Sequence, residues 1–543
     1  MTELHAMPGE PSPRGAQACI ITDARHPIPV GAQTVAEVLD ETLATRPDAL
    51  AVVGRSGRLT YAELDAVANR AANALIGLGV QPGDRVGAAL PNDVDIVVAF
   101  LGAMRIGAIW VGVPRVFAPP EKAYLSRDAE LSVLLADPAV STEARAAEHG
   151  FVDGLTVVTV DPHDPSAEWA QLLDAAGDTR PDRPIDPFAP AAIAYTSGTT
   201  GRPKGVVHSQ HNILMPGAVT KAFFDFPIDG PIASSAPFTL LNLLVLVPVT
   251  AFQVGTSCVV LDSNKASEVA EWIEREQIMH LTVVPTVYHD LLGDPSVTPR
   301  QLASLTRPRS GGAAVTETLR ERWFERFGTR IASSLAMTEG PTFVTEEDRH
   351  HPPPPGALGT AARHLEITIR GDDDQPLPVG DVGEICVAPK TDGPWAGVYT
   401  CMLGYWNAPD ETARALRGGV LHTGDVGRLD EHGHLFLVDR KSSLIIRGGS
   451  NIYPAEVERA ISSDARVAEC AVVARPDERL GETTVAFVRL RPDADLTAGE
   501  LREHCALHLS SYKVPDEIRI VDDFPRSALG KIKRAELALA ARS

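Results

Sequence analysis

Apolar and polar positions along the first 330 residues follow periods that predict helices and strands in alternation. Thr60 and Glu63 form a capping box, and the positions after them are apolar at helical spacing until Gly79 ends the helix. The next segments, "DRVGAAL", "DIVVAFLGAMRIG" and "AIWVGV", predict a strand, a helix and a strand, and "SEVAEWIEREQI" with "HLTVVP" repeats the pattern. This alternation predicts an α/β fold with largely parallel sheets covered by helices.

The pattern changes twice in the rest of the chain. From about 365 to 438 the sequence reads as short strands separated by turns, which predicts a small β-rich subdomain. The acidic run from Asp372 to Asp374 in this part is typical of a solvated turn rather than a metal site. The last hundred residues return to mixed helices and strands and can bury a core of their own. We therefore expect a leader over residues 1–30, a large N-terminal domain over 31–439 and a smaller α+β C-terminal domain over 440–543.

Composition and charge narrow the classes of function. The chain has 543 residues, and its 50 Lys and Arg against 71 Asp and Glu give a net charge of −21, which argues against nucleic acid or an anionic membrane surface as a partner. No run of eighteen apolar residues occurs, so we expect no membrane span. Glu and Pro occupy the N-terminus where a signal peptide needs an apolar run, and the six cysteines show no CxxC spacing. We expect a reduced, cytoplasmic protein without structural zinc.

The segment "IAYTSGTTGRPKGVVHS", residues 193–209, carries five Ser or Thr side chains, three glycines and one lysine between two strand-like runs. It is not a Walker loop, because Pro203 and Gly205 stand where GxxxxGK[ST] requires Gly and then Ser or Thr. A flexible linker has a similar composition. A tight connection inside a core instead favours a loop whose backbone N–H groups, hydroxyls and Lys204 hold phosphate.

The segment "YTSGTTGRPKG" resembles the signature loop of the adenylate-forming superfamily, which includes acyl-CoA synthetases, adenylation domains of peptide synthetases and luciferases. Further signatures follow in the family's order and near its spacing: "RSGGAAV" (309–315), "LAMTEG" (335–340), "GEICV" with "LGYWN" (383–387 and 403–407), "LHTGDVG" (421–427), "DRKSSLIIRGGSNIYPAEVE" (439–458) and "PRSALGKIKR" (525–534). The resemblance covers residues 35 to 540. It implies an AMP-forming acid–CoA ligase with a mobile C-terminal domain.

Such an enzyme joins a carboxylic acid to the α-phosphate of ATP, and the thiol of CoA then displaces AMP. By resemblance, the β- and γ-phosphates are held by Thr196, Ser197, Gly198, Thr199, Thr200, Gly201 and Lys204, and the adenine side is formed by Gly312, Ala313, Ala314, Leu335, Ala336 and Met337. Thr338 is expected to bond the α-phosphate, Glu339 to hold Mg²⁺, and Asp425 to accept the ribose hydroxyls. Arg440 is expected near the ribose, and Lys531 between the substrate carboxylate and the α-phosphate. Taken singly, Glu339, Asp425 and Lys531 also fit ordinary surface or turn positions; the ordered set of motifs favours the catalytic roles.

Three positions depart from the family pattern. Leu335 stands where an aromatic residue usually stacks on adenine, and Ala336 replaces a glycine near the expected carboxylate site. Ser442 occupies the hinge position, where Asp or Lys is usual, and its small side chain is compatible with hinging. After rotation of the C-terminal domain, the tunnel for the pantetheine arm of CoA is expected to be lined by Arg447, Gly448 and Gly449, although these residues also fit a plain hairpin turn.

The acid itself is specified only by class. The segment "APFTLLNLLVLVPV" has neither the aspartate of amino-acid activators nor the histidine of aryl relatives, and its Phe238, Leu240 and Leu241, together with Ala336, predict an apolar pocket. The same apolar side chains fit a buried core. We expect a hydrophobic acid of the fatty, aryl or polycyclic (terpenoid) class. Two alternatives stay open: a ligase that loads a carrier protein in trans, and a catalytically silent paralogue that binds the acid or the nucleotide.

Overall fold

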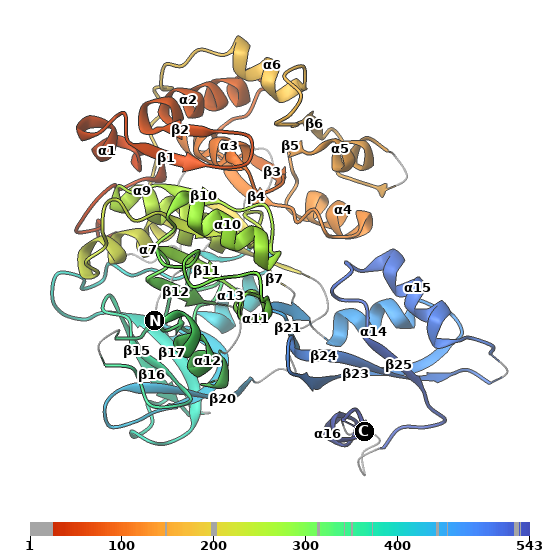
Figure 1. Cartoon of the computed structure of the whole chain (residues 1–543). Coiled ribbons are helices and arrows are strands. Elements are labelled where there is room, and N and C mark those ends of the chain that lie inside the picture. Colours follow the sequence, from red (N-terminus) through yellow and green to blue (C-terminus); the bar gives the residue numbers. More distant parts are fainter. Residues whose placement is uncertain are drawn as a thin grey trace.

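The computed structural model describes residues 25–146, 149–196, 203–311, 315, 317–341, 343–348, 351–371, 373–440, 445–452, 454–492, 494–525, 532 and 534–542. Their strands form two seven-stranded sheets, a six-stranded sheet and a five-stranded C-terminal sheet. Figure 1 shows the C-terminal part, in blue, at one side of the larger N-terminal part. The predicted α/β class is confirmed.

The first seven-stranded sheet carries the strands on either side of the predicted phosphate loop. Its order is β18-β8-β7-β4-β3-β5-β6, and β3 to β7 run parallel, whereas β8 is antiparallel to β7 and β18. The strands are β3 (Arg85–Ala89), β4 (Ile109–Gly112), β5 (Val133–Ala136), β6 (Thr156–Thr159), β7 (Pro190–Thr196), β8 (Lys204–Ser209) and β18 (Gly404–Tyr405).

The second seven-stranded sheet has the order β13-β12-β11-β9-β10-β1-β2, in which only β2 is antiparallel to its neighbour. Largely parallel sheets of this kind agree with the alternating pattern in the sequence. The strands are β1 (Leu50–Val53), β2 (Arg58–Thr60), β9 (Ile232–Ser234), β10 (Cys258–Val260), β11 (His280–Val283), β12 (Arg307–Ser310) and β13 (Ala332–Ser333).

Helices cover these two sheets (Figure 1). Helix α2 (Tyr61–Gly77) begins with the predicted capping box, in which Thr60 accepts from the Glu63 amide and Glu63 accepts from the Thr60 amide. Helices α2 and α3 contribute to the largest apolar core of the described residues. The other helices of this part are α1 (Asp40–Thr45), α3 (Val94–Arg105), α4 (Pro119–Asp128), α5 (Pro138–Arg145), α6 (Glu168–Ala175), α7 (Gln210–Phe223), α8 (Leu241–Leu244), α9 (Thr250–Val254), α10 (Ala266–Glu276), α11 (Pro285–Gly293) and α12 (Glu317–Phe327).

The six-stranded sheet is antiparallel and contains the strands expected between 365 and 438. It starts earlier than the sequence predicts, because β14 and β15 join it. Asp374 lies in the expected turn, but its carboxylate contacts Arg370 and His422 instead of only solvent, and Asp372 lies outside the described residues. The elements are β14 (Thr345–Glu346), β15 (Ala357–Ala361), β16 (Leu365–Arg370), β17 (Gly383–Pro389), α13 (Pro409–Ala415), β19 (Leu421–Leu429) and β20 (His434–Arg440).

The C-terminal sheet is covered on both faces, each with its own apolar cluster. Helices α14 and α15 lie over one face and α16 lies over the other (Figure 1). Strand β20 still pairs with β19, whereas β21 pairs with β24, so the change of sheet falls between Arg440 and Ile445. The elements are β21 (Ile445–Arg447), β22 (Ser450–Ile452), α14 (Pro454–Ser462), β23 (Val467–Asp477), β24 (Gly481–Leu490), α15 (Ala498–His508), β25 (Glu517–Ile520) and α16 (Arg534–Ala540).

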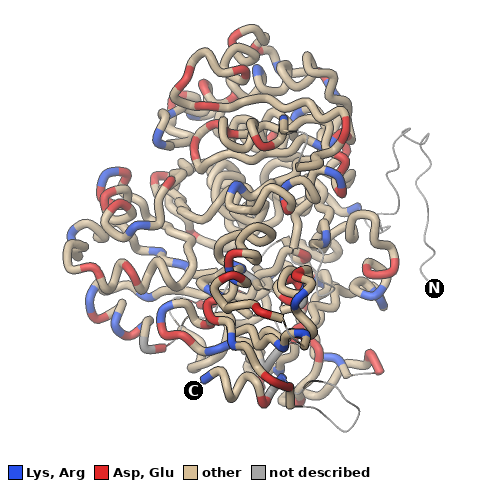
Figure 2. Tube along the Cα trace, turned by 90° about the vertical axis from the view of Figure 1, so that its right-hand side faces the viewer, with Lys and Arg blue, Asp and Glu red and all other residues tan. Residues whose placement is uncertain are grey.

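Charged residues of both signs are interspersed along the trace (Figure 2). Within the part of the chain that the structure describes, every helix is too short or too polar to cross a membrane. The five described cysteines are free thiols.

Candidate functional site

The two strands around the predicted phosphate loop form an antiparallel pair that closes it. Thr196 at the end of β7 lies opposite Lys204 at the start of β8, so both ends of the loop are held at one sheet edge. Gly205 follows, and a Cβ there would overlap the Ile193 side chain, so the close packing of β8 on β7 requires glycine. The tight connection expected from the sequence is therefore present at both ends of the loop.

Thr338 and Glu339 lie at the tip of a short hairpin made by residues 335–345. The amide of Val344 donates to the Leu335 carbonyl (2.7 Å), and the Leu335 amide donates to the Thr345 hydroxyl (2.8 Å). Leu335 is 9% exposed, and Ala336 forms an isolated bridge with Phe343. Because the base of the hairpin is buried and bonded, the segment "AMTE" has a defined position.

Tyr405 joins the phosphate-loop lysine to the predicted metal ligand. Its hydroxyl donates to Glu339 Oε1 at 2.9 Å, and its ring centroid lies 5.3 Å from Lys204 Nζ. The amide of Met402 also donates to the Glu339 carbonyl at 2.8 Å. The structure thus brings Lys204 and Glu339, 135 positions apart, to one place. Sequence reasoning missed Tyr405 as a functional residue, although it stands in the motif "LGYWN".

Two further polar side chains lie behind Thr338. Asn242 Nδ2 donates to the Thr338 hydroxyl at 3.5 Å, a long contact. His208 on β8 is fully buried, and burial lowers the pKa of its imidazole to about 4, so the ring is neutral. Asn242 lies in the segment that the sequence predicts as an apolar pocket wall. Sequence reasoning missed this amide, because the prediction rested on the apolar residues around it.

The residues predicted to line an acid pocket do not share one environment. Phe238 is fully buried and Leu241 is 4% exposed, and both belong to the main core, whereas Leu240 is 43% exposed. Burial of Phe238 and Leu241 favours the core interpretation that the sequence left open.

Arg309 lies beside the hairpin that carries Thr338 and Glu339. Its Nη2 donates to the Ser334 hydroxyl at 3.0 Å, and its guanidinium is 4.8 Å from the Phe343 ring.

Asp425 lies on β19 with 3% of its surface exposed. Its amide donates to the Thr423 hydroxyl at 3.1 Å, and it pairs across the strands with Arg440. The two residues expected at the ribose are therefore neighbours, although the side chain of Arg440 is not described.

The predicted CoA-side hairpin connects β21 and β22 and touches the N-terminal part. Gly448 and Gly449 have φ values of +56° and +80°, and a Cβ on Gly449 would overlap the Val284 side chain. Arg447 is directed to Asp516 within the C-terminal part (2.7 Å for the shortest of three hydrogen bonds). Of the three residues expected on the CoA side, the structure places the two glycines against β11 and α11, and Arg447 in an ion pair.

Comparisons with known proteins agree with this arrangement. Residues 39–406 match the family described as AMP-binding enzyme, and residues 456–531 match its C-terminal domain. This chain belongs to that family. It is 32% identical to a feruloyl-CoA synthase from Amycolatopsis sp over 90% of this chain and 96% of the relative, and 30% identical to the fatty acid–[acyl-carrier-protein] ligase ScoC from Streptomyces coeruleorubidus over 93% and 96%. The amide bond synthetase McbA from Marinactinospora thermotolerans has a similar structure (TM-score 0.82, 28% identity, 94% of this chain and 100% of that one).

The family membership settles the general chemistry. The protein is an adenylate-forming enzyme, an AMP-forming acid–CoA ligase that uses ATP, a carboxylic acid and CoA. Several predicted site residues of this enzyme lie outside the described residues: Ser197, Gly198, Thr199, Thr200, Gly201, Gly312, Ala313, Ala314, Ser442 and Lys531.

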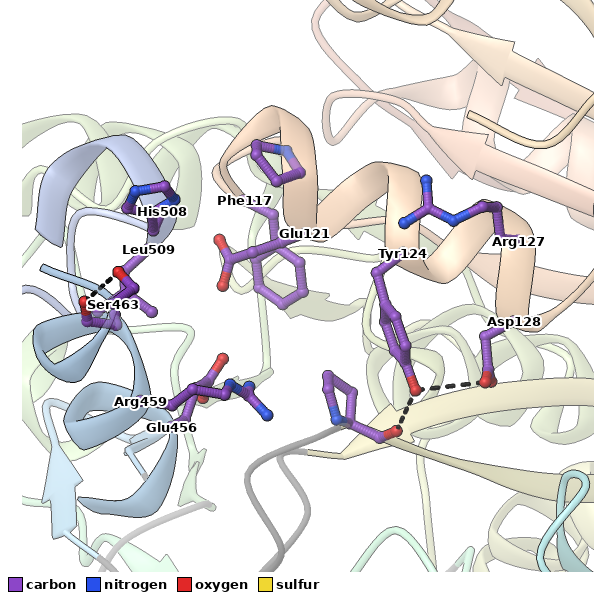
Figure 3. A pocket seen from close by; sticks show the side chains of 13 residues that line it. Phe117, Glu121, Tyr124, Arg127, Asp128, Glu456, Arg459, Ser463, His508 and Leu509 are labelled. Atoms are coloured by element: carbon purple, nitrogen blue, oxygen red, sulfur yellow. Dashed lines mark hydrogen bonds between the residues drawn. The ribbon is translucent and has the colours of Figure 1, made fainter. Parts of the chain in front are cut away.

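The ligase has a cavity of about 660 Å³ between its two parts, next to the exit of the phosphate loop. Helix α4 forms one wall, α14 and α15 form the other, and Pro203 lies at its edge (Figure 3). Beside the cavity, the buried Lys513 amine contacts Glu121 of α4 (3.0 Å) and Glu456 of α14 (2.7 Å). Sequence reasoning missed this link, because nothing in the sequence pairs Lys513 with a residue 392 positions away.

Proposed function

We propose that Lys204, Thr338 and Glu339 form the ATP-phosphate and metal site of this ligase, and that its acid is predominantly apolar. The contact of Tyr405 with Glu339 and with Lys204 carries the proposal, because it gathers the predicted phosphate and metal ligands around one ring. In the first step a carboxylate oxygen attacks the α-phosphorus and pyrophosphate leaves. In the second the thiol sulfur attacks the acyl carbon, AMP leaves and the thiol loses its proton.

Mg²⁺ fits the donor set at the hairpin tip. A hard cation prefers carboxylate and phosphate oxygens, and Glu339 offers a carboxylate held by the Tyr405 hydroxyl. Glu339 would hold the ion, whose charge would offset that of the phosphates when bound. The Lys204 amine adds a second positive charge beside the loop, and Thr338 adds a neutral donor.

For the acid we infer an aryl or aliphatic chain without a free amine. The segment 236–249 has no aspartate to pair with an amine. The names of relatives, among them feruloyl-CoA and long-chain fatty acid ligases, support acids of this class.

CoA is the acceptor of an acid–CoA ligase, and a carrier protein is the alternative acceptor that the screen below tests. The relative ScoC is a carrier-protein ligase, so the general chemistry is compatible with both. With either acceptor, the hairpin with Gly448 and Gly449 would lie near the thiol while Gly449 packs against Val284 of the N-terminal part.

The proposal is tested with Lys531→Ala and a synthetic acyl-AMP. Because Lys531 is expected to act at the α-phosphate, adenylation should fall by roughly 10²–10³ while thioester formation from acyl-AMP persists. If both half-reactions stay intact, Lys531 does not have this role. A pyrophosphate-release screen over diverse acids, with CoA or with a holo-carrier protein, identifies the acid class and the acceptor. Absence of release across the panel would favour a silent binding paralogue.

A further inference from the structure

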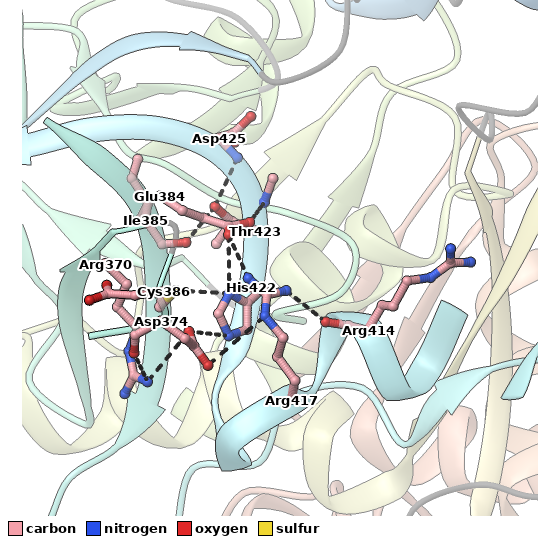
Figure 4. Close-up of polar contacts among 12 residues, drawn as sticks. Arg370, Asp374, Glu384, Ile385, Cys386, Arg414, Arg417, His422, Thr423 and Asp425 are labelled. Carbon is pink, nitrogen blue, oxygen red and sulfur yellow. Dashed lines mark hydrogen bonds and ion pairs between the residues drawn. The ribbon is translucent and has the colours of Figure 1, made fainter. Parts of the chain in front are cut away.

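His422 lies between two carboxylates in a buried cluster next to Asp425. Its Nδ1 is 3.2 Å from Glu384 Oε2, and its Nε2 is 3.3 Å from Asp374 Oδ1 (Figure 4). The side chains of His422 and Glu384 are 2% and 7% exposed. The three residues come from β19, β17 and the turn after β16, so the cluster ties three segments of the six-stranded sheet together.

The two ring nitrogens of His422 have different contacts: Nδ1 lies within hydrogen-bond distance of Glu384 Oε2, whereas Nε2 has no hydrogen bond among the described residues. A neutral imidazole has one donor and one acceptor, and a carboxylate only accepts. His422 therefore donates from Nδ1 to Glu384 Oε2, and the Asp374 carboxylate lies beside Nε2 without a hydrogen bond. The Cys386 sulfur also lies 3.3 Å from Nδ1, but burial raises the pKa of this thiol to about 12, so it carries no negative charge at neutral pH.

Arginines on two sides keep the carboxylates paired. Arg417 Nη2 is 2.9 Å from Glu384 Oε2, and Arg370 Nη1 is 3.7 Å from Asp374 Oδ1. Glu384, Cys386 and His422 lie within 4.8 Å of one another, but the Arg417 guanidinium already contacts the carboxylate oxygen that would face a cation. We therefore assign a structural role and no metal ion to this cluster.

Glu384 and its strand hold the turn that presents Asp425. The second carboxylate oxygen, Glu384 Oε1, accepts from the Gly424 amide at 3.2 Å. The Thr423 hydroxyl donates to the Ile385 carbonyl (2.7 Å) and accepts from the Asp425 amide (3.1 Å). Gly424 has φ of +74°, a conformation that a glycine adopts without strain. The position of Asp425 thus depends on β17 through Glu384.

We propose that Glu384, His422 and Asp374 are positioning residues that fix Asp425 toward the nucleotide ribose. The inference rests on the proposed role of Asp425.

The measurement is the preference for ATP over 2′,3′-dideoxy-ATP in acid-dependent pyrophosphate release. The two nucleotides carry the same triphosphate and differ only in the ribose hydroxyls. The ratio of their kcat/KM values therefore reports the contact with those hydroxyls. We expect Glu384→Gln and His422→Asn each to lower this ratio about 10-fold, mainly through KM. Glu276→Gln is the matched control, since the Glu276 side chain on α10 is 6% exposed and is paired with Arg58 of β2 and Arg275 of α10.

Asp425→Asn distinguishes the ribose role of Asp425 from the positioning role of Glu384 and His422. If Asp425→Asn keeps the preference, the ribose role of Asp425 in the proposed function is wrong. If Asp425→Asn loses it while Glu384→Gln and His422→Asn keep it, with melting temperatures near that of the control, only the positioning role is wrong. Inhibition of the wild type by micromolar Zn²⁺ that Cys386→Ser abolishes would overturn the structural assignment in favour of a metal site.

Discussion

At the scale of single residues, one hydroxyl connects the charges of the proposed phosphate site. Tyr405 bonds the Glu339 carboxylate and lies over the Lys204 amine, so it fixes where the metal ligand points. The sequence carries Tyr405 in a quoted motif without indicating this role, because the contact joins segments that are distant in the chain.

Replacing Tyr405 by Phe tests this contact. The ring stays, but Glu339 loses a hydrogen bond to a charged group, which is worth about 1.5–3 kcal/mol at most. We expect adenylation to slow about 10-fold and the Mg²⁺ concentration for half-maximal rate to rise. Pyrophosphate exchange at varied Mg²⁺ measures both.

Tyr61→Phe is the control for the loss of a buried hydroxyl, because Tyr61 donates to the Thr256 carbonyl away from this cluster. A Tyr405→Phe enzyme with the rate and Mg²⁺ dependence of this control would show that Tyr405 only fills space.

At the scale of elements, the sequence predicts helices and strands well, but it predicts poorly what surrounds each side chain. The capping box of Thr60, the strand with Lys204 and the strands after 365 all follow from periodicity and turn residues, which act within a few positions. Phe238 and Leu241 lie in the core, because the same apolar pattern serves a core and a pocket alike. Pairings such as His422 with Asp374 depend on sheet register, which one strand's pattern does not specify.

The hairpin between β21 and β22 offers a test at this scale. Gly449 has φ of +80° and packs against Val284, so Gly449→Ala adds both backbone strain and a steric clash with the N-terminal part. We expect thioester formation from acyl-AMP to fall at least 10-fold while adenylation changes less than 2-fold. Rapid-quench measurement of each half-reaction decides this.

Gly433→Ala separates the two causes. Gly433 has φ of +78° in the turn before β20, but an added Cβ meets nothing within 4 Å. If Gly433→Ala slows thioester formation as much as Gly449→Ala does, backbone strain rather than contact with Val284 explains the loss.

At the scale of the whole molecule, Lys513 links the two parts of the ligase. Burial lowers the pKa of its amine, but the neighbouring Tyr512, Glu456 and Glu121 together raise it above its usual value, so the amine is charged at neutral pH. Burial also raises the pKa of the Glu121 carboxyl. Buried charges are stable only when paired, so separating the two parts must expose Lys513 and Glu121 to water or leave them without each other.

Glu121→Gln should therefore destabilise this orientation more than other orientations of the C-terminal part. Removing one partner of a buried pair costs about 3–5 kcal/mol, and the remaining contact with Glu456 reduces this to about 1–2 kcal/mol. Because Gly449 approaches Val284 in the same orientation, we expect thioester formation from acyl-AMP to slow roughly 5- to 30-fold, and adenylation to change less than 2-fold.

Glu143→Gln is a matched control, because Glu143 of α5 pairs with the buried Lys122 of α4 entirely within the N-terminal part (2.6 Å). Loss of that pair lowers stability without touching the contact between the parts, so both half-reactions should keep their ratio. If Glu121→Gln lowers both half-reactions equally, as a general loss of folded enzyme would, then Lys513 stabilises the fold and does not select the orientation. A selective loss in thioester formation means that the pair with Glu121 holds the C-terminal part in the orientation used for the second step.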